Sequence, residues 1–370
     1  MRVGPELAIY LFLFGASFLL VLVLTPVTMV LARRFHAMDY PNKRKVHRVP
    51  VPRLGGIALV AAVALTLTAG AGINVYIRAG LLSTIGILTG LVIIVALGVY
   101  DDIHNVRPAV KVIFQVAAAG IAVALGIRFQ LASNPLAFHV RDYFDLGAFS
   151  IPLTIIWIVA LTNAMNLIDG LDGLAAGIAM FASIALFLIS VQQHAGIVTY
   201  FYVTIAGATL AFLRFSRHPA KVFMGDCGST FLGFLLACLS VLGTQKSYTL
   251  AALFVPLIVF GVPIFDAIIS VVRRYVTRDN VMDGDLKHIH HQLLYSGLNQ
   301  RQAVVILYSV TIMLGIIGFA FTFLLDEYAA VILGIIGILG GFTAKELYGF
   351  GNAGESVEDE SKPPAQTQGK

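Results

Sequence analysis

The segment NAMNLIDGLDGL, residues 163–174, carries two amides and two carboxylates at every third position: Asn163, Asn166, Asp169 and Asp172. Residues three apart are neighbours on a helix, but each step rotates by about 60°, so the four cannot share one face. Gly170 would loosen the helix and let a ligand approach the backbone. Carboxylate and amide oxygens suit magnesium and the hydrogen bonds of a ribose or a base. An inter-helix turn needs only one DG dipeptide, so the pattern favours a ligand site.

The segment GVYDDIHNV places two adjacent carboxylates, Asp101 and Asp102, at the end of an apolar run. Such neighbours repel each other unless a cation lies nearby or one of them stays protonated. A magnesium ion would relieve the repulsion, and so would Lys111, which follows at the start of the next apolar run. A solvated helix end is the simpler alternative for an isolated pair. Together with the other clusters, the pair favours a functional role.

The segment KVFMGDCGST places Asp226 between two glycines, just before another apolar run. A carboxylate at a helix start can hold a metal ion while free backbone N–H groups face an anion. Phe223, three residues earlier, is suited to stacking on a base. An ordinary helix cap is the alternative.

The segment DGDLKHIHHQL contains three clustered histidines, His288, His290 and His291. Zinc is one interpretation, but this spacing does not match the common zinc motifs and no cysteine is near. Contact with phosphate, or support of a metal site, fits the cluster better.

Two further features are consistent with a functional site of this kind. Asp266 lies inside an apolar run, and an ionisable group within a membrane span is a functional hypothesis by default. The segment PNKRKVHRVPVPRLGG is densely cationic and carries Arg48 and Arg53. It is either a membrane anchor or a site for a diphosphate or a lipid phosphate.

The composition shows what kind of element must position these groups. The chain has 370 residues, of which 58% are hydrophobic and 12% charged, against about 25% charged in a soluble domain. Eleven apolar runs have spanning length: 7–32, 54–72, 81–100, 108–126, 150–168, 172–191, 197–214, 229–244, 248–272, 303–325 and 328–349. Backbone groups in lipid must be satisfied internally, so the runs predict helices. We expect an all-α polytopic membrane bundle, with residues 1–350 as one domain and 351–370 as a disordered polar tail.

The basic residues predict an orientation. Seventeen Lys and Arg residues follow odd-numbered runs, and five lie in the loops of the other side. Because Lys and Arg favour cytoplasmic loops, we expect the N-terminus outside and every cluster above on the cytoplasmic face. Carboxylates, amides, cations and glycine loops at a membrane face suit metal-dependent phosphoryl transfer between a soluble nucleotide donor and a lipid. We expect no nucleic-acid partner.

Five segments, in order, resemble the polyprenyl-phosphate N-acetylhexosamine-1-phosphate transferases: PNKRKVH…PVPRLGG, DD with Lys111 and Gln115, NAMNLIDGLDGL, FMGDCGS and HIHH. PVPRLGG, HIHH and an eleventh span resemble the GlcNAc-1-phosphate branch more than the muramyl-pentapeptide branch. The resemblance implies transfer of N-acetylglucosamine-1-phosphate from UDP-GlcNAc to undecaprenyl phosphate, releasing UMP. It also implies Mg²⁺, with Mn²⁺ as the alternative ion, another UDP-N-acetylhexosamine as the alternative donor, the bacterial inner (plasma) membrane as the location, and a homodimer.

The resemblance also implies roles for individual residues. Asp226 corresponds to the metal ligand, with Asn166 as a second. The uridine pocket corresponds to Gly170, Leu171, Asp172 and Phe223, and the essential carboxylate pair to Asp101 and Asp102. Groups near the phosphates correspond to Lys111, His288, His290 and His291, with Arg48 and Arg53 aligning less cleanly. Asn163 and Asp169 remain substrate-site residues without a specific role.

The choice between two mechanisms stays open, and two other classes of protein are disfavoured. The reaction is either a single in-line attack by the lipid phosphate, which we favour, or a two-step route through an aspartyl intermediate. A CDP-alcohol phosphotransferase is disfavoured because Gly177 stands where that motif needs Arg. A transporter is disfavoured because most polar groups lie at one membrane face rather than at its middle.

Overall fold

The computed structural model describes residues 3–41, 49–129, 131–133, 143–244, 250–277 and 288–323. All of them lie within one compact unit, residues 1–324. The predicted last span, 328–349, and the predicted tail, 351–370, lie outside the described residues, as does Arg48.

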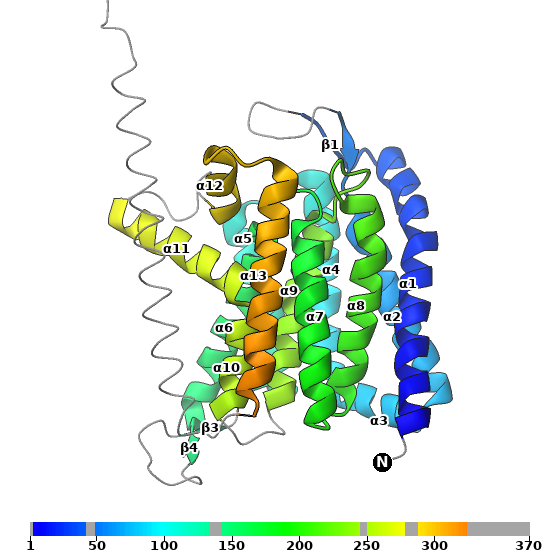
Figure 1. The fold of residues 1–370 in the computed structure, drawn as a ribbon, viewed down its shortest axis with the longest axis vertical. Coiled ribbons are helices and arrows are strands. Elements are labelled where there is room, and N and C mark those ends of the chain that lie inside the picture. Colours follow the sequence, from blue (N-terminus) through cyan, green and yellow to red (C-terminus); the bar gives the residue numbers. More distant parts are fainter. Residues whose placement is uncertain are drawn as a thin grey trace, which may run out of the picture. The chain divides into compact units, whose positions relative to one another are not determined.

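The described part of the chain is a bundle of helices (Figure 1). Those of the first half are α1 (Val3–Arg34), α2 (Gly55–Ile73), α3 (Val75–Ser83), α4 (Ile85–His104), α5 (Pro108–Ala124) and α6 (Ser150–Leu167). Those of the second half are α7 (Leu174–Gln192), α8 (Ile197–Ser216), α9 (Gly225–Thr244), α10 (Leu250–Val259), α11 (Gly261–Thr277), α12 (Ile289–Tyr295) and α13 (Gln300–Phe321). A 3₁₀ turn, Gly147–Phe149, precedes α6.

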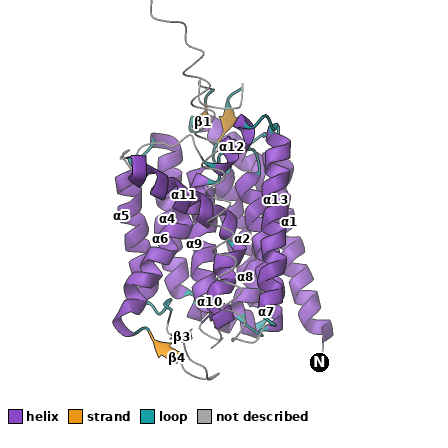
Figure 2. Cartoon of the chain, turned by 60° about the vertical axis from the view of Figure 1, so that its left-hand side comes forward, coloured by secondary structure: helices purple, strands orange, loops and turns teal. Residues whose placement is uncertain are grey.

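Two short antiparallel hairpins lie at opposite ends of the bundle. One pairs β1 (Met38–Asp39) with β2 (Val51–Pro52), and the other pairs β3 (Leu131–Ser133) with β4 (Tyr143–Asp145). Figures 1 and 2 show β1 and α12 at one end, and β3, β4 and the N-terminus at the other.

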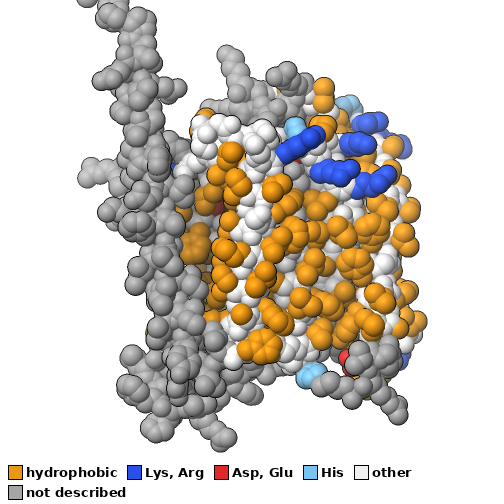
Figure 3. All heavy atoms as spheres, in the orientation of Figure 1, with side chains coloured by type: hydrophobic (Ala, Val, Ile, Leu, Met, Phe, Trp, Pro, Cys, Tyr) orange, Lys and Arg blue, Asp and Glu red, His pale blue; other side chains and the backbone are white. Residues whose placement is uncertain are grey.

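Eight helices in the described ranges are long and apolar enough to cross a membrane, so the protein is a multi-pass membrane protein. Large apolar side chains cover the outside of the bundle, where Leu11 is 63% and Val92 70% exposed. Figure 3 shows this apolar surface, with Lys and Arg gathered toward the end that carries β1 and α12. The all-α membrane bundle is confirmed, whereas the count of eleven spans and the orientation stay predictions.

Helix α9 is the centre of the bundle. Every one of its side chains from Cys227 to Leu242 is buried, and it packs against both α4 and α6. The helix begins at Gly225, four residues earlier than the predicted span 229–244. Asp226 therefore stands in the first turn of a helix that the rest of the protein surrounds.

The predicted span 248–272 is two helices rather than one. Helix α10 ends at Val259 and α11 begins at Gly261. Pro263 explains the break, because a proline ring clashes with the carbonyl four residues earlier, which is that of Val259. Helix α11 then leaves the bundle axis at a steep angle (Figure 1). This redirection brings Asp266 of α11 beneath α12, as the contacts below show.

Candidate active site

Four helix ends meet at the end of the bundle that carries β1 and α12. Asp101 and Asp102 lie in the last turn of α4, and Lys111 lies in the first turn of α5. Asn166 lies in the last turn of α6, and Asp226 in the first turn of α9. Consecutive helices run in opposite directions, so the end of one and the start of the next fall at the same level.

Asp102 caps the start of α9. Its Oδ1 accepts a hydrogen bond from the backbone N of Asp226 at 2.8 Å, and its Oδ2 accepts one from the backbone N of Cys227 at 3.1 Å. The first N–H groups of a helix lack partners within the helix, so a carboxylate here satisfies two of them. Gly225 makes the approach possible, because it has a φ of +71° and a Cβ there would lie 2.5 Å from Asp102 Oδ2.

Lys111 bridges Asp101 and Asp226. Its Nζ lies 2.6 Å from Asp101 Oδ2 and 2.5 Å from Asp226 Oδ2. Asp101 Oδ1 also accepts a hydrogen bond from the backbone N of Val106 at 2.6 Å. The two adjacent aspartates therefore point to different partners, and a lysine supplies the compensating charge that the DD pair required.

Arg53 connects the β2–α2 loop to the same carboxylates. Its Nε lies 3.7 Å from Asp102 Oδ1, and its Nη2 lies 3.6 Å from Asp226 Oδ1. The loop is held by backbone hydrogen bonds from Gly55 N to Phe223 O (3.1 Å) and from Gly56 N to Met224 O (2.8 Å). The two glycine-containing loops therefore lie against each other, with the arginine above the start of α9.

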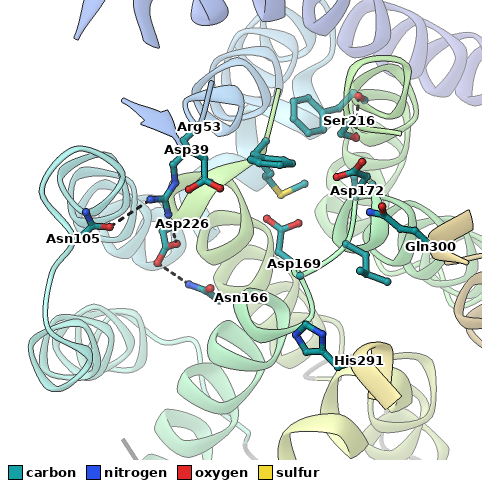
Figure 4. A pocket seen from close by; sticks show the side chains of 18 residues that line it. Asp39, Arg53, Asn105, Asn166, Asp169, Asp172, Ser216, Asp226, His291 and Gln300 are labelled. Atoms are coloured by element: carbon teal, nitrogen blue, oxygen red, sulfur yellow. Dashed lines mark hydrogen bonds and ion pairs between the residues drawn. The ribbon is translucent and has the colours of Figure 1, made fainter. Parts of the chain in front are cut away.

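A cavity of about 430 Å³ opens beside these groups. It is lined by Asp39, Arg53, Asn105, Asn166, Asp169, Gly170, Leu171, Asp172, Gly173, Ala176, Phe212, Ser216, Phe223, Met224, Gly225, Asp226, His291 and Gln300. Figure 4 shows Arg53, Asn166 and Asp226 on one side, Asp172, Ser216 and Gln300 on the other, and Asp169 between them. The cavity therefore has an ionic side and a hydrogen-bonding side.

The turn between α6 and α7 forms the middle of the wall. Asp172 Oδ2 accepts hydrogen bonds from His218 Nδ1 at 2.7 Å and from the backbone N of Ala220 at 3.1 Å. Gly173 has a φ of +78°, and its carbonyl accepts a hydrogen bond from the Tyr308 hydroxyl at 2.7 Å. These contacts from the α8–α9 loop and from α13 fix the turn, so the glycines allow a defined turn rather than a loose helix end.

Asp169 faces the cavity among other carboxylates (Figure 4). Burial, reinforced by the negative charges of Asp226 and Asp102, raises the pKa of Asp169 well above the usual value of a carboxyl group. A cation near Asp169 would lower this pKa, because a positive charge favours the ionised form of the carboxyl group.

Asp266 of α11 contacts the start of α12. Asp266 Oδ2 lies 3.0 Å from His288 Nδ1, and its Oδ1 accepts a hydrogen bond from the backbone N of Ile289 at 2.8 Å. Both side chains are buried. The carboxylate thus holds the first turn of α12 and leaves His291 on the cavity wall.

His290, in the first turn of α12, packs against the α6–α7 turn. A Cβ at Gly170 would lie 2.2 Å from His290 Nε2, so the ring rests directly on the backbone of Gly170. Burial, reinforced by the neighbouring His291, lowers the pKa of His290 to about 3. His290 is therefore a neutral packing group at neutral pH, and its contact depends on the absence of a side chain at position 170.

Nine of the predicted site residues line the cavity: Arg53, Asn166, Asp169, Gly170, Leu171, Asp172, Phe223, Asp226 and His291. Asp101, Asp102 and Lys111 do not line the cavity, but Lys111 contacts Asp226 and Asp101, and Asp102 accepts a hydrogen bond from the backbone N of Asp226. Asn163, His288 and His290 do not line the cavity, and Asn163 Nδ2 instead donates to Gln115 Oε1 at 2.6 Å. The roles of these residues stay predictions.

Several lining residues were not predicted from the sequence, notably Asp39, Asn105, Ser216 and Gln300. Asn105 had a local signal, because it follows the DD pair and ends α4 in a left-handed conformation. Ser216 and His218 lie just before the KVFMGD segment, and Asp39 lies just before the cationic loop. Gln300 had no local signal, since only the fold brings the start of α13 to this cavity.

The oxygen ligands of this site fit a magnesium ion. In the described part of the chain no three His, Cys, Asp or Glu side chains are close enough to hold a metal by themselves. Magnesium does not need such a cage, because it usually binds one or two carboxylates, waters and substrate phosphates. Asp226 and Asn166 both line the cavity, and Asn166 donates its Nδ2 to Asp226 Oδ2 at 3.0 Å. A carboxylate and an amide oxygen are thus close together on the cavity wall.

Comparison with known proteins finds one matching family and several related transferases. Residues 84–244 match the model of glycosyl transferase family 4. A Bacillus subtilis protein named "Probable undecaprenyl-phosphate N-acetylglucosaminyl 1-phosphate transferase" is 37% identical over 310 residues, covering 84% of this chain and 82% of that protein. A decaprenyl-phosphate N-acetylglucosaminephosphotransferase of Mycobacterium tuberculosis is 33% identical over 85% of this chain and 83% of that protein.

A third relative is the undecaprenyl-phosphate alpha-N-acetylglucosaminyl 1-phosphate transferase of Escherichia coli, which is 29% identical over 86% of this chain and 84% of that protein. Each of the three matches covers more than four fifths of this chain. The chain therefore belongs to glycosyl transferase family 4, in the branch of the undecaprenyl-phosphate N-acetylglucosaminyl 1-phosphate transferases.

Proposed function

We propose that the protein transfers N-acetylglucosamine-1-phosphate from UDP-GlcNAc to undecaprenyl phosphate, releasing UMP, in a Mg²⁺-dependent reaction. The product, undecaprenyl-diphosphate-GlcNAc, would be the first membrane intermediate of a cell-surface polysaccharide. The names of the relatives support the prenyl phosphate and the sugar phosphate. The two-sided cavity is the observation that supports a nucleotide donor.

The ionic side of the cavity suits a diphosphate. Arg53 lies on the wall with its Nη2 3.6 Å from Asp226 Oδ1, so it is the described cation best placed to meet phosphate oxygens. Lys111 lies behind Asp226 and orients that carboxylate. Asp226, with Asn166 and Asp169 nearby, would hold the magnesium ion, which would neutralise charge on the diphosphate.

The other side of the cavity suits the nucleoside. Asp172 is fixed by His218 and Ala220, and Gly170 and Leu171 of the same turn also line the cavity. Phe223 lines the same cavity and offers a flat ring for a base. A donor bound across both sides would place its diphosphate beside Asp226.

The reaction we propose is a single in-line displacement. An oxygen of the lipid phosphate attacks the β-phosphorus of UDP-GlcNAc and forms a new P–O bond. The bond from that phosphorus to the oxygen bridging the α-phosphate breaks, and UMP leaves with that oxygen. The chain's residues position the reactants and offset charge, which is most of what phosphoryl transfer requires.

We place the site at the cytoplasmic face of the bacterial inner membrane. Lys and Arg gather at the same end of the bundle as the cavity (Figure 3), and such residues favour cytoplasmic loops. This is the side on which soluble UDP-sugars are available. A homodimer remains part of the proposal by resemblance alone.

A substrate panel tests the proposal. Purified full-length protein in detergent, with Mg²⁺ and undecaprenyl phosphate, receives UDP-GlcNAc, UDP-GalNAc, UDP-glucose or UDP-muramyl-pentapeptide, and UMP is quantified. We expect UMP from UDP-GlcNAc, none when undecaprenyl phosphate is omitted, and none after Mg²⁺ is chelated. Release of UMP only from the muramyl-pentapeptide donor would assign the other branch, and no UMP from any donor would contradict the proposal.

A further inference from the structure

Gln300 carries a buried polar atom whose partner is missing from the described residues. The side chain lies on the cavity wall at the start of α13 and is only 8% exposed. Its Oε1 is buried and has no hydrogen-bond partner in the described ranges of the chain. An unpaired buried polar atom costs free energy unless something else supplies the hydrogen bond. Because no protein hydrogen bond to Oε1 fixes the carboxamide in the described structure, a 180° turn about its last bond can bring either its oxygen or its amino group to the cavity side.

The start of α13 does not explain this side chain. Asn299 caps the helix by accepting from Gln302 N at 3.0 Å, and Gln302 Oε1 accepts from Asn299 N at 2.9 Å. This capping box is complete without Gln300. The carboxamide of Gln300 is therefore available for a role in the cavity.

The neighbourhood of Gln300 indicates which ligand it meets. Figure 4 shows Gln300 beside Asp172 and Ser216, on the side of the cavity away from Arg53 and Asp226. Asp172 uses Oδ2 for His218 and Ala220, and in the described structure Oδ1 has no protein partner. A carboxylate oxygen beside a carboxamide can meet a ligand edge that presents a donor next to an acceptor.

We propose that Gln300 is a specificity-determining residue that recognises the pyrimidine edge of the donor nucleotide together with Asp172. This inference rests on the proposed function, since it needs a nucleotide donor bound across the cavity. Uracil presents an imide N–H between two carbonyl oxygens. Asp172 accepts from the N–H, and the carboxamide of Gln300, which can rotate by 180° about its last bond, donates its N–H to the adjacent carbonyl.

The same pair disfavours cytosine. Cytosine presents a lone pair where uracil has its imide N–H, and an amino group where uracil has a carbonyl. The lone pair would face the Asp172 carboxylate, and the amino group would face the donor of Gln300. Replacing Gln300 by Glu, which only accepts, removes the second of these penalties and creates a penalty against uracil.

Binding of UMP and CMP to the full-length protein tests this, measured by isothermal titration calorimetry in detergent with Mg²⁺. We expect Gln300→Leu to raise the Kd for UMP by about two- to tenfold, the usual effect of losing one neutral hydrogen bond. Gln300→Glu should also lower the preference for UMP over CMP. The matched control is Gln193→Leu, because Gln193 lies after the far end of α7 and is half-buried. It should bind UMP as the wild type does.

The outcomes separate this inference from the function on which it rests. A wild-type protein that binds no uridine nucleotide would contradict the proposed function itself. A wild type that prefers UMP, with both Gln300 variants unchanged, would overturn only the role of Gln300. Loss of UMP affinity with an unchanged preference for UMP over CMP would also overturn base recognition. Thermal unfolding of each variant without nucleotide shows that the fold is retained.

Discussion

The carboxylate of Asp102 caps the helix on which Asp226 stands, through hydrogen bonds at 2.8 Å to the N of Asp226 and 3.1 Å to the N of Cys227. Its neighbour Asp101 instead contacts Lys111, which in turn contacts Asp226. The two adjacent aspartates thus hold Asp226 from two directions, one through the backbone and one through the side chain. Geometry around Asp226 is set by α4, α5 and α9 together.

Lys111→Met should inactivate the protein. Without the ammonium, Asp101 and Asp226 face each other with no shared cation, and removing one partner of a buried pair costs about 3 kcal/mol or more. We expect UMP release to fall by about 100-fold or more. Arg107→Met is the control, because Arg107 is exposed and directly precedes α5. Activity above half of wild type in Lys111→Met would show that the bridge is dispensable.

Gly170→Ala should damage both the turn and α12. The added Cβ would lie 2.2 Å from His290 Nε2, so the ring or the turn must move, at a cost of about 1–3 kcal/mol. We expect a lower thermal midpoint and a higher KM for the nucleotide donor. Gly120→Ala is the matched control, since a Cβ there meets nothing within 4 Å and alanine favours a helix. Equal behaviour of the two variants would contradict the contact.

Asp266 should act as a positioning residue for α12. Asp266→Ala removes both hydrogen bonds to the start of α12, whereas Asp266→Asn keeps an acceptor for Ile289 N. We therefore expect Ala to reduce activity more than Asn, with faster hydrogen exchange in α12 in the same order. Wild-type exchange in α12 of Asp266→Ala would show that the carboxylate does not hold the helix.

His290 should make stability depend on pH in a defined direction. Its pKa is lowered to about 3 in the folded protein, against 6.5 when unfolded. Between pH 3 and pH 6.5 the unfolded state binds more protons than the folded state. The contribution of the neutral His290 to the free energy of unfolding is therefore fully present above pH 6.5 and is lost as the pH falls toward 3. We expect the thermal midpoint to fall less steeply below pH 6.5 in His290→Gln than in wild type. Identical slopes would contradict the buried neutral imidazole.

Much of the site could be predicted because its charged and polar residues are grouped in short sequence segments. Asp101, Asp102, Asp226 and the 163–174 segment all stand next to apolar runs, so the membrane topology alone placed them near one face. Lys111, one of the cations that the sequence offered to the DD pair, lies 2.6 Å from Asp101 Oδ2.

The features of the site that the sequence did not predict depend on packing between distant segments. Nothing near Gln300 in the sequence signals a cavity, and Ser216 is marked only by lying just before the KVFMGD segment. Both reach the cavity because α8 and α13 pack on α7. The break between α10 and α11 did have a signal in Pro263, but an unbroken apolar run outweighed it. His288 illustrates the opposite case, because its buried contact with Asp266 supports α12 rather than lining the cavity.

The fate of the β-phosphate of the donor distinguishes transfer of the sugar phosphate from transfer of the sugar alone. UDP-GlcNAc carrying radiophosphorus in its β-phosphate is incubated with the protein, Mg²⁺ and undecaprenyl phosphate, and the lipid is extracted. We expect the label to move into the lipid fraction in step with UMP release, and Asp226→Asn to abolish both. Label that stays in the aqueous phase as UDP would show transfer of the sugar alone and would contradict sugar-phosphate transfer.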